Sequence, residues 1–196
     1  IKLDGVALNS LAIKTRGQKV SILFQQAQAP ISTRAYDFVM SARHPWISRW
    51  AGPTRDDQDI VVESLSQMGL EALMHRDVGS LSGGERRRVE LAATVAQNAQ
   101  TILLDEPVNH LDLHYQINLL QGALKKWRAE GRAVVMVMHD LNLAIRFSDH
   151  LLCLCGDGST LQGETSAVAT AENLSTLLRY PLQELTLGDR SFFIPT

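Results

Sequence analysis

Two neighbouring acids, Asp105 and Glu106, follow the short apolar run Thr101–Leu104 and precede Pro107. Such a run is typical of a strand buried on both sides of a parallel sheet, and open α/β sheets bind ligands beyond the carboxyl ends of their strands. Adjacent residues on an extended chain point to opposite sides, so the two carboxylates can serve different tasks. In phosphoryl transfer, one acid holds Mg²⁺, usually through water, and another orients or deprotonates the attacking water. Acids that merely cap a strand in solvent are the alternative for this string taken alone.

A second string, Ser82-Gly83-Gly84, precedes a helical pattern over Glu85–Asn98. Glycine has no Cβ, so the amides of Gly83 and Gly84 can approach a ligand closely. The start of a helix presents free N–H groups and the positive end of the helix dipole, which together suit an anion. The string therefore predicts an anion site, with a serine N-cap on an ordinary amphipathic helix as the alternative. We interpret the three arginines Arg86–Arg88 as a solvated face of that helix.

Three more polar residues follow or begin predicted elements. Gln25 follows a predicted strand over Val20–Phe24, where an amide can touch Mg²⁺ or water. His139 follows another predicted strand over Ala133–Met138, and a histidine at such a strand end can reach a γ-phosphate. A lone histidine there is more often a hydrogen-bonded structural group, and that alternative stays open. Asp112 is placed to N-cap a helix.

In chain order these residues resemble the motifs of an ATP-binding-cassette (ABC) nucleotide-binding domain, and the resemblance covers nearly the whole chain. The motifs are the Q-loop, the signature turn, the Walker B strand with its catalytic glutamate, the D-loop and the H-loop, carried here by Gln25, Ser82-Gly83-Gly84-Glu85, Asp105-Glu106, Asp112 and His139. The resemblance implies an α/β fold, that of an ABC-type P-loop NTPase domain with a helical subdomain. It also implies ATP and Mg²⁺ as cofactors.

The resemblance assigns roles to the residues around one nucleotide. Asp105 would act in the Mg²⁺ sphere, Glu106 as the general base for water, and His139 as the contact to the γ-phosphate. Gln25 would sense both Mg²⁺ and the membrane partner.

The resemblance also implies a head-to-tail dimer. The turn Ser82–Gly84 would cap the nucleotide held by the opposite subunit, and Asp112 would cross the interface between the subunits. Glu85 stands where the family more usually has Gln, which keeps a polar residue in the first helical turn, where a carboxylate suits the dipole. Phe24 stands where a proline often precedes the Q-loop glutamine.

The phosphate loop of that family, G-x-x-x-x-G-K-[ST], does not occur in the 196 residues. The segment Gly17–Ser21 lacks the second glycine and the Lys–Ser adjacency, while Ile1–Gly5 resembles the strand and turn that follow the phosphate-loop helix. The resemblance therefore predicts an N-terminally truncated domain whose first strands and phosphate loop precede residue 1. We expect this chain alone to bind ATP weakly and to be inactive, because the cradle for the β-phosphate and its lysine are absent.

The composition is that of a globular protein without an excess of basic residues. Hydrophobic residues make up 45% of the chain and charged residues 20%, and the net charge of −2 gives no support for nucleic-acid binding. No apolar run approaches membrane-spanning length, and we expect no signal peptide in these 196 residues. The two cysteines, Cys153 and Cys155, are spaced to lie on one face of a strand. We interpret them as reduced packing residues rather than as metal ligands.

We expect residues 1–196 to form a single truncated nucleotide-binding domain. Its helical subdomain is predicted at about residues 30–80, its catalytic α/β core at 1–29 and 81–155, and a C-terminal hairpin and helix at 156–196. Helices are predicted over Ser32–Arg43, after a capping box that begins at Thr54, and over Ala171–Leu178.

The stretch Arg43-His44-Pro45 resembles a feature of importer ATPases for iron-siderophore, haem and cobalamin uptake, and so does Leu103–Pro107 together with His139–Asn142. The function implied is the ATP-hydrolysing subunit of a bacterial ABC importer for a metal chelate. The partners implied are ATP, a second copy of the subunit in a homodimer, transmembrane permease subunits and, indirectly, a periplasmic substrate-binding protein. The implied location is the cytoplasmic face of the bacterial inner membrane. The alternatives are a soluble ABC ATPase that acts on nucleic acid or ribosomes, and a non-catalytic remnant that binds partners.

Overall fold

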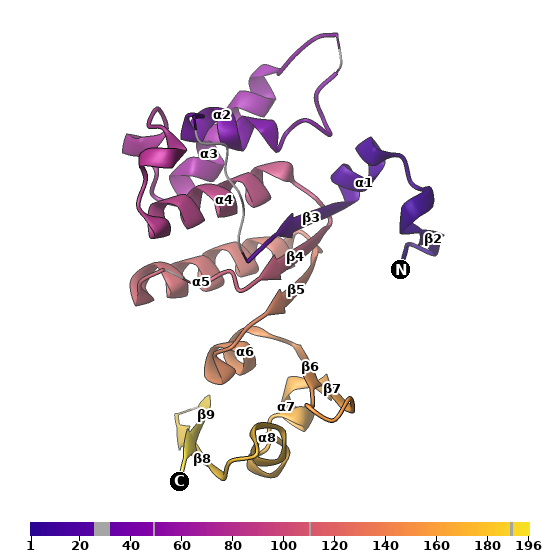
Figure 1. Cartoon of the computed structure of the whole chain (residues 1–196), viewed down its shortest axis with the longest axis vertical. Helices are drawn as coiled ribbons and strands as arrows, with labels where there is room; N and C mark the ends of the chain where they lie inside the picture. Colours follow the sequence, from indigo (N-terminus) through magenta and orange to yellow (C-terminus); the bar gives the residue numbers. More distant parts are fainter. Residues whose placement is uncertain (26–31, 49, 110, 189) are drawn as a thin grey trace. The chain divides into compact units, whose positions relative to one another are not determined.

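The computed structural model describes residues 1–25, 32–48, 50–109, 111–188 and 190–196. It contains two compact units, residues 1–137 and 138–196, which we describe one at a time (Figure 1). Residue 30, the predicted start of the helical subdomain, lies outside the described residues. No helix among those residues has the length and apolar character needed to cross a membrane.

A three-stranded parallel sheet in the order β3-β4-β5 lies at the centre of the first unit (Figure 1). Its strands are β3 (Val20–Leu23), β4 (Thr101–Asp105) and β5 (Ala133–Val137). The register pairs Leu23 with Leu104, and Leu104 with Met136. The three carboxyl ends therefore meet at one edge of the sheet, where Gln25 and Glu106 follow their strands as the apolar runs predict.

Helices of the first unit pack together and against this sheet. They are α1 (Ile13–Lys19), α2 (Ala35–Ser41), α3 (Arg55–Gln67), α4 (Gly83–Gln97) and α5 (Leu113–Ala129), with 3₁₀ turns at Leu8–Ser10, Glu71–Leu73 and Val78–Ser80. α2, α3 and α4 pack on one another around the fully buried Val39, Val61 and Leu91. This helical layer carries the Ser82 turn at the start of α4.

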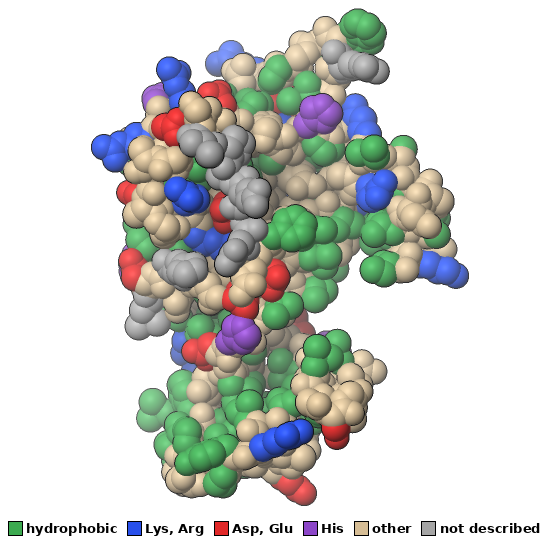
Figure 2. Space-filling view, in the orientation of Figure 1, with side chains coloured by type: hydrophobic (Ala, Val, Ile, Leu, Met, Phe, Trp, Pro, Cys, Tyr) green, Lys and Arg blue, Asp and Glu red, His purple; other side chains and the backbone are tan. Residues whose placement is uncertain are grey.

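One face of the sheet is packed, and the other is exposed. Ile102 and Leu104 are buried on the face where α4 contacts β3 and α5 contacts β5. On the alternate face Ile22, Val135 and Val137 are exposed, and Figure 2 shows apolar side chains at the surface of this unit. The prediction of a buried strand is therefore wrong for this face of β5, whereas Thr101 and Leu103 on the same face of β4 are half-buried. Burial alternates in the same sense along all three strands, so Leu23 and Leu104, which are partners in the register, lie on the same, more buried face.

The predicted helix over Ser32–Arg43 is shorter in the structure, because both of its ends make other contacts. Residues 32–34 pair with a neighbouring segment, since the N–H of Val78 donates to the C=O of Thr33 at 2.9 Å. At the other end, Arg43 lies beyond the helix and turns its guanidinium to Asp57, with Nε at 2.9 Å from Oδ1. Both side chains of this ion pair are buried.

The predicted capping box at the start of α3 is confirmed. The N–H of Asp57 donates to Oγ1 of Thr54 at 3.2 Å, and the N–H of Thr54 donates to Oδ2 of Asp57 at 3.0 Å. Burial raises the pKa of Asp57, but the hydrogen bonds from Thr54 and Arg43 outweigh it and hold that pKa below its usual value. The stabilisation is therefore present above about pH 4 and is lost as the pH falls below it.

We expect Thr54→Ala to lower the free energy of unfolding by about 1 kcal/mol, because the first turn of α3 loses its side-chain acceptor. Thr54→Ser keeps the hydroxyl and is the matched control, with stability close to that of the wild type. Urea unfolding at neutral pH measures both variants. Equal midpoints for Thr54→Ala and the wild type would contradict a stabilising role for the cap.

A short hairpin opens the first unit, and it contains the strand and turn that Ile1–Gly5 predicts. Strands β1 (Lys2–Leu3) and β2 (Val6–Ala7) pair antiparallel. Asp4 and Gly5 connect them with φ values of +51° and +78°. A two-residue turn with two positive φ angles matches the twist of a hairpin, and Gly5 adopts its φ without steric cost.

The second unit contains α6 and two hairpins with helices between them. Its elements are α6 (Leu141–Phe147), β6 (His150–Leu154), β7 (Thr160–Glu164), α7 (Thr165–Val168), α8 (Ala171–Leu178), β8 (Leu182–Leu187) and β9 (Arg190–Pro195). The helix predicted over Ala171–Leu178 is confirmed. Cys153 and Cys155 are free, half-buried thiols, and burial raises the pKa of Cys153. This agrees with their interpretation as packing residues.

Candidate functional site

Glu106 leaves the sheet in a backbone conformation that is unusual for a residue with a side chain. It directly follows β4, its N–H donates to the C=O of Val137 at 3.0 Å, and its φ is +47°. A non-glycine residue in this left-handed region costs free energy and persists only where the surrounding contacts hold it. Glu106 is also only 6% exposed. The contacts around it therefore fix this acid at the carboxyl edge of the sheet.

Two amide side chains hold the carboxylate of Glu106. Gln25 Nε2 donates to Glu106 Oε2 at 2.9 Å, and Asn109 Nδ2 donates to the same oxygen. The chain turns back after Glu106, and the N–H of Asn109 donates to the C=O of Glu106 at 3.2 Å. Gln25 is thus brought to the site as predicted. Asn109 was not predicted as a site residue, although an amide three residues after an acid, just past a proline, is a signal for such a turn.

Asp105 occupies the last position of β4 and is half-buried. Strand alternation places it on the exposed face of the sheet with Leu103, so the two neighbouring acids have different surroundings, as predicted. Among the described residues, no three His, Cys, Asp or Glu side chains gather as a metal cluster. A single carboxylate at this edge nevertheless fits Mg²⁺, which takes one or two protein carboxylates and completes its shell with water and phosphate oxygens.

The Ser82 turn is a complete capping box. The N–H of Glu85 donates to Ser82 Oγ at 3.3 Å, and Ser82 donates to Glu85 Oε2 from its N–H at 2.8 Å and from its hydroxyl at 2.7 Å. The hydrogen bond from the Ser82 side chain, followed by that from its backbone, lowers the pKa of Glu85. The alternative of a serine N-cap is thus correct as a description of the local structure, and it leaves the start of α4 exposed to a ligand.

No contact within the described chain explains glycine at position 83. Gly83 is the first residue of α4, and a Cβ added to it would meet no described atom within 4 Å apart from its chain neighbours and the adjacent backbone of its own helix. Its φ is not among the positive values. Neither packing nor backbone conformation therefore accounts for the missing side chain.

Arg87 is buried, so the interpretation of Arg86–Arg88 as a solvated face is wrong. It is 4% exposed and forms an ion pair with Glu90 through Nη1 at 3.0 Å. Nη1 also donates to the C=O of Phe24 at 2.7 Å, and Nη2 donates to the C=O groups of Asp105 and Glu106 at 2.7 and 2.9 Å. The pairing of Arg87 with Glu90 three residues later is a signal that the sequence offers and that we missed.

Arg88 is also engaged by the protein. Its Nη1 donates to the C=O of Met68 at 2.8 Å and to that of Gly69 at 3.1 Å. Its guanidinium lies over the ring of Tyr115, 4.1 Å from the centroid. Arg88 therefore ties α4 to the end of α3 and the start of α5.

Asp112 and His139 lie in different units. Asp112 Oδ1 accepts from the N–H of Tyr115 at 3.1 Å, so it N-caps α5 as predicted. His139 belongs to the second unit, where it is exposed and precedes Asp140, the N-cap of α6. The first unit thus brings together Gln25, Asp105 and Glu106, and His139 is not part of the group that this unit assembles.

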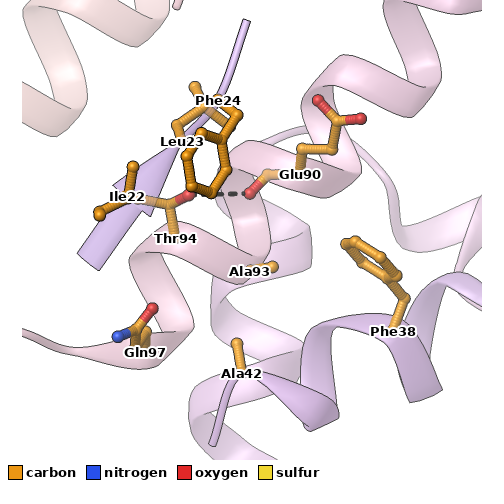
Figure 3. Close-up of a pocket in the computed structure, with 9 residues that line it drawn as sticks. All are labelled: Ile22, Leu23, Phe24, Phe38, Ala42, Glu90, Ala93, Thr94 and Gln97. Carbon is orange, nitrogen blue, oxygen red and sulfur yellow. Dashed lines mark hydrogen bonds between the residues drawn. The ribbon is translucent and has the colours of Figure 1, made fainter. Parts of the chain in front are cut away.

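A small cavity of about 120 Å³ lies beside β3, between α2 and α4 (Figure 3). Phe24, Phe38 and Ala93 line it, together with Glu90, the ion-pair partner of Arg87. Figure 3 shows the hydrogen bond from Thr94 to the C=O of Glu90, 3.0 Å long, on the helix that forms one wall. The cavity is smaller than the roughly 300–1,000 Å³ of ligand sites and is lined mostly by apolar atoms. We assign it no nucleotide.

The sequence of this chain is similar to a family model and to several named proteins. Residues 1–109 match the ABC transporter family. A petrobactin import ATP-binding protein of Bacillus anthracis is 34% identical, with 93% of this chain and 67% of the relative covered. The achromobactin transport ATP-binding protein of Dickeya dadantii (strain 3937) is 34% identical, with 85% of this chain and 62% of the relative covered. The chain thus spans about two thirds of the length of these relatives.

Solved structures share the fold. A structure assigned as a metal-chelate type ABC transporter, in an inward-facing conformation, is 28% identical with a TM-score of 0.79, covering 91% of this chain and 72% of that one. An ATP-binding cassette solved as a dimer in a post-hydrolysis state, bound to ADP and Pi, is 27% identical with a TM-score of 0.72, covering 83% of this chain and 72% of that one. With an α/β fold that matches these cassettes, and with the family match over residues 1–109, the chain belongs to the ABC transporter family.

Proposed function

We propose that this chain is part of the ATP-hydrolysing subunit of a bacterial ABC importer that takes up an iron-siderophore, haem or cobalamin-type metal chelate. The observation that carries the ATPase proposal is the buried Glu106 carboxylate, held by two amides at the carboxyl edge of a parallel sheet. The importer proposal is supported by relatives that are named for the import of petrobactin and the transport of achromobactin.

Glu106 is the general base in the proposed reaction. A carboxylate that accepts a proton from water turns that water into a nucleophile for the γ-phosphate. Gln25 and Asn109 hold one oxygen of this carboxylate, so the attacking water meets it in one orientation. Asp105 is the residue that would hold Mg²⁺ or its water shell, with Gln25 beside it. When bound, the ion offsets the negative charge of the phosphates.

The Ser82 turn acts on the nucleotide of a second subunit in a homodimer. Neither packing nor backbone conformation explains why residue 83 is glycine. A glycine here would let a molecule outside the chain approach the amide closely. An exposed helix start suits a phosphate group. The similar cassette that was solved as a dimer with ADP and Pi supports a nucleotide-binding homodimer. Asp112, which caps α5, contacts the partner subunit in this proposal.

The remaining assignments complete the proposal. His139 contacts the γ-phosphate, and Gln25 reports the state of the site to transmembrane permease subunits. A periplasmic substrate-binding protein selects the chelate, and the subunit works at the cytoplasmic face of the inner membrane. Residues about 30–80 form the helical subdomain, 1–29 and 81–155 the catalytic core, and 156–196 a closing hairpin and helix. Support for these points comes from the sequence motifs and from the import and transport names of the relatives.

The test of the proposed function uses the restored protein, by which we mean this chain preceded by a segment that carries a G-x-x-x-x-G-K-[ST] phosphate loop. We expect it to release phosphate from ATP in the presence of Mg²⁺ and without stimulation by nucleic acid. Absence of turnover by a folded restored protein would favour the non-catalytic alternative. Stimulation by RNA or ribosomes would favour a soluble ABC ATPase.

We expect Asp105→Asn in the restored protein to raise the Mg²⁺ concentration for half-maximal ATP hydrolysis by about 10-fold to 100-fold, because the site loses one negative charge beside the ion. Asp4→Asn removes an exposed carboxylate that pairs with Lys19 and is the matched control. Phosphate release is measured across a Mg²⁺ titration at saturating ATP. An unchanged half-maximal concentration in Asp105→Asn would remove Asp105 from the Mg²⁺ sphere.

A further inference from the structure

Arg87 joins three segments of the first unit that are distant in the sequence. Its guanidinium donates to the C=O of Phe24 at the end of β3 and to the C=O groups of Asp105 and Glu106 at the end of β4. Its own backbone lies in the second turn of α4, just after the Ser82 capping box. We propose that Arg87 is a positioning residue for Glu106, one that ties the helix carrying the Ser82 turn to the backbone of the proposed base.

The placement of these hydrogen bonds supports the proposal. Phe24 directly precedes Gln25, so Arg87 holds the backbone next to the residue that donates to the carboxylate. It also holds the C=O of Glu106, the residue that accepts that bond. Both ends of the contact between Gln25 and Glu106 are therefore fixed to one side chain. The left-handed φ of +47° at Glu106 needs such restraint, since an unrestrained residue would relax from it.

The chemistry of the side chain also favours a positioning role. The planar guanidinium presents several N–H donors in a fixed geometry, which lets one residue meet three carbonyls and a carboxylate. The ion pair with Glu90, itself only 8% exposed, balances the buried charge. A lysine could pair with Glu90, but its single ammonium has three donors and cannot span both strand ends in the same way. A shift of α4 relative to β4 would therefore change the position of the Glu106 backbone, and with it that of the carboxylate.

This inference rests on the proposed function for its effect on turnover, but the restraint on the backbone can be tested without ATP. Removing Arg87 alone leaves the buried Glu90 unpaired, which endangers folding. The main test variant is therefore the double substitution Arg87→Met and Glu90→Met, which removes both charges and keeps apolar volume. Arg43→Gln is the control, because Asp57, the partner of Arg43, keeps its hydrogen bonds from the N–H and hydroxyl of Thr54 in this variant. Arg43 is another buried arginine, paired with Asp57, and its Nη1 donates to the C=O of Ala96 near the other end of α4 at 2.8 Å.

The first measurement is amide hydrogen exchange on the 196-residue chain. The N–H groups of Glu106 and Asn109 donate to the C=O groups of Val137 and Glu106. We expect both amides to exchange at least about tenfold faster in the double variant, because the turn loses charge-assisted hydrogen bonds. In Arg43→Gln these two amides are expected to keep the wild-type rate. Unchanged exchange at both amides in the double variant would overturn the inference, whatever the outcome of the ATPase test.

The second measurement is steady-state ATP hydrolysis by the restored protein. We expect the double variant to lose about 10²-fold in kcat, because a base displaced by about 1 Å is poorly oriented, while KM for ATP changes little. Arg87→Lys keeps the ion pair with Glu90 and is expected to lose less in kcat than the double variant. Arg43→Gln is expected to lower the unfolding midpoint but to keep kcat. An equal loss of kcat in Arg43→Gln, or wild-type kcat in a folded double variant, would overturn the inference.

The two proposals fail in different ways. If the restored wild type does not hydrolyse ATP, the proposed function fails while hydrogen exchange still decides whether Arg87 holds Glu106. If the double variant does not fold, Arg87→Lys decides the question, since its kcat falls only if the shape of the guanidinium matters. Wild-type kcat and wild-type exchange in Arg87→Lys would then overturn the positioning role.

Discussion

Glu106→Gln in the restored protein is expected to slow single-turnover ATP hydrolysis by about 10²-fold to 10⁴-fold, because an amide cannot accept the proton of the attacking water. ATP binding should be retained, since the substitution keeps the size of the side chain. The carbonyl oxygen of the new amide can still accept from Gln25 and Asn109, so the turn at the end of β4 is expected to survive. The loss should therefore appear in the chemical step alone.

The measurement is a rapid-quench single turnover with enzyme in excess of ATP, together with a binding titration. Glu71→Gln is a suitable control, because it removes an exposed carboxylate that accepts only from the hydroxyl of Ser66 among the bonds described. Hydrolysis at the wild-type rate by Glu106→Gln would end the assignment of Glu106 as the base. Loss of ATP binding in this variant would point instead to a role in holding the nucleotide.

Mixed dimers of the restored protein are expected to show whether the Ser82 turn acts on the nucleotide of the opposite subunit (in trans) or on that of its own subunit (in cis). Gly84→Val adds a branched side chain at the place where, in the proposed arrangement, a phosphate oxygen would approach the amides of the Ser82 turn. We place it in one subunit and Glu106→Gln in the other. If the turn acts in trans, both lesions fall on one composite site and the opposite site is intact. About half of the wild-type phosphate release then remains, since one of two sites carries both defects.

The control places both lesions in the same subunit, opposite a wild-type partner. If the turn acts in trans, this arrangement damages both composite sites and turnover falls to the level of the Glu106→Gln homodimer. If the turn acts in cis, the dimer with both lesions in one subunit keeps one intact site and about half of the phosphate release. The dimer with the lesions in separate subunits then has no intact site and is inactive. The arrangement with the greater residual phosphate release therefore decides between the two geometries.

Much of the sheet edge could be predicted from the sequence, because apolar runs and the polar residues that follow them are local signals. Gln25 and Glu106 lie beyond strands that the runs Val20–Phe24 and Thr101–Leu104 predict, and the parallel register brings them into hydrogen-bond contact. The capping boxes at Thr54 and Ser82 are local in the same way, since their partners lie three residues apart. Such signals depend only on spacing along the chain, so they can be recognised before the fold is known.

The parts that escaped prediction depend on contacts between distant segments. Arg87 is 63 residues from Phe24 and 19 from Glu106 along the chain, and an arginine in a charged run resembles a solvated residue until the strands that cover it are known. The exposure of Val135 and Val137 was not predicted either, because it depends on which face of the sheet is left uncovered. An apolar run predicts a strand, but it does not state how many of its faces are covered.

The left-handed backbone at Glu106 has a consequence for how this position changes during evolution. A φ of +47° disfavours β-branched residues, and glycine adopts it without strain. A glutamate codon reaches glycine by a single nucleotide change, so mutation offers this site a replacement that relieves its backbone and abolishes its carboxylate. At residue 106 the backbone conformation therefore favours glycine, whereas the proposed catalytic role requires glutamate. If Glu106 is the proposed base, selection for turnover would oppose this replacement, and a lineage released from that selection would be free to accept glycine at this position.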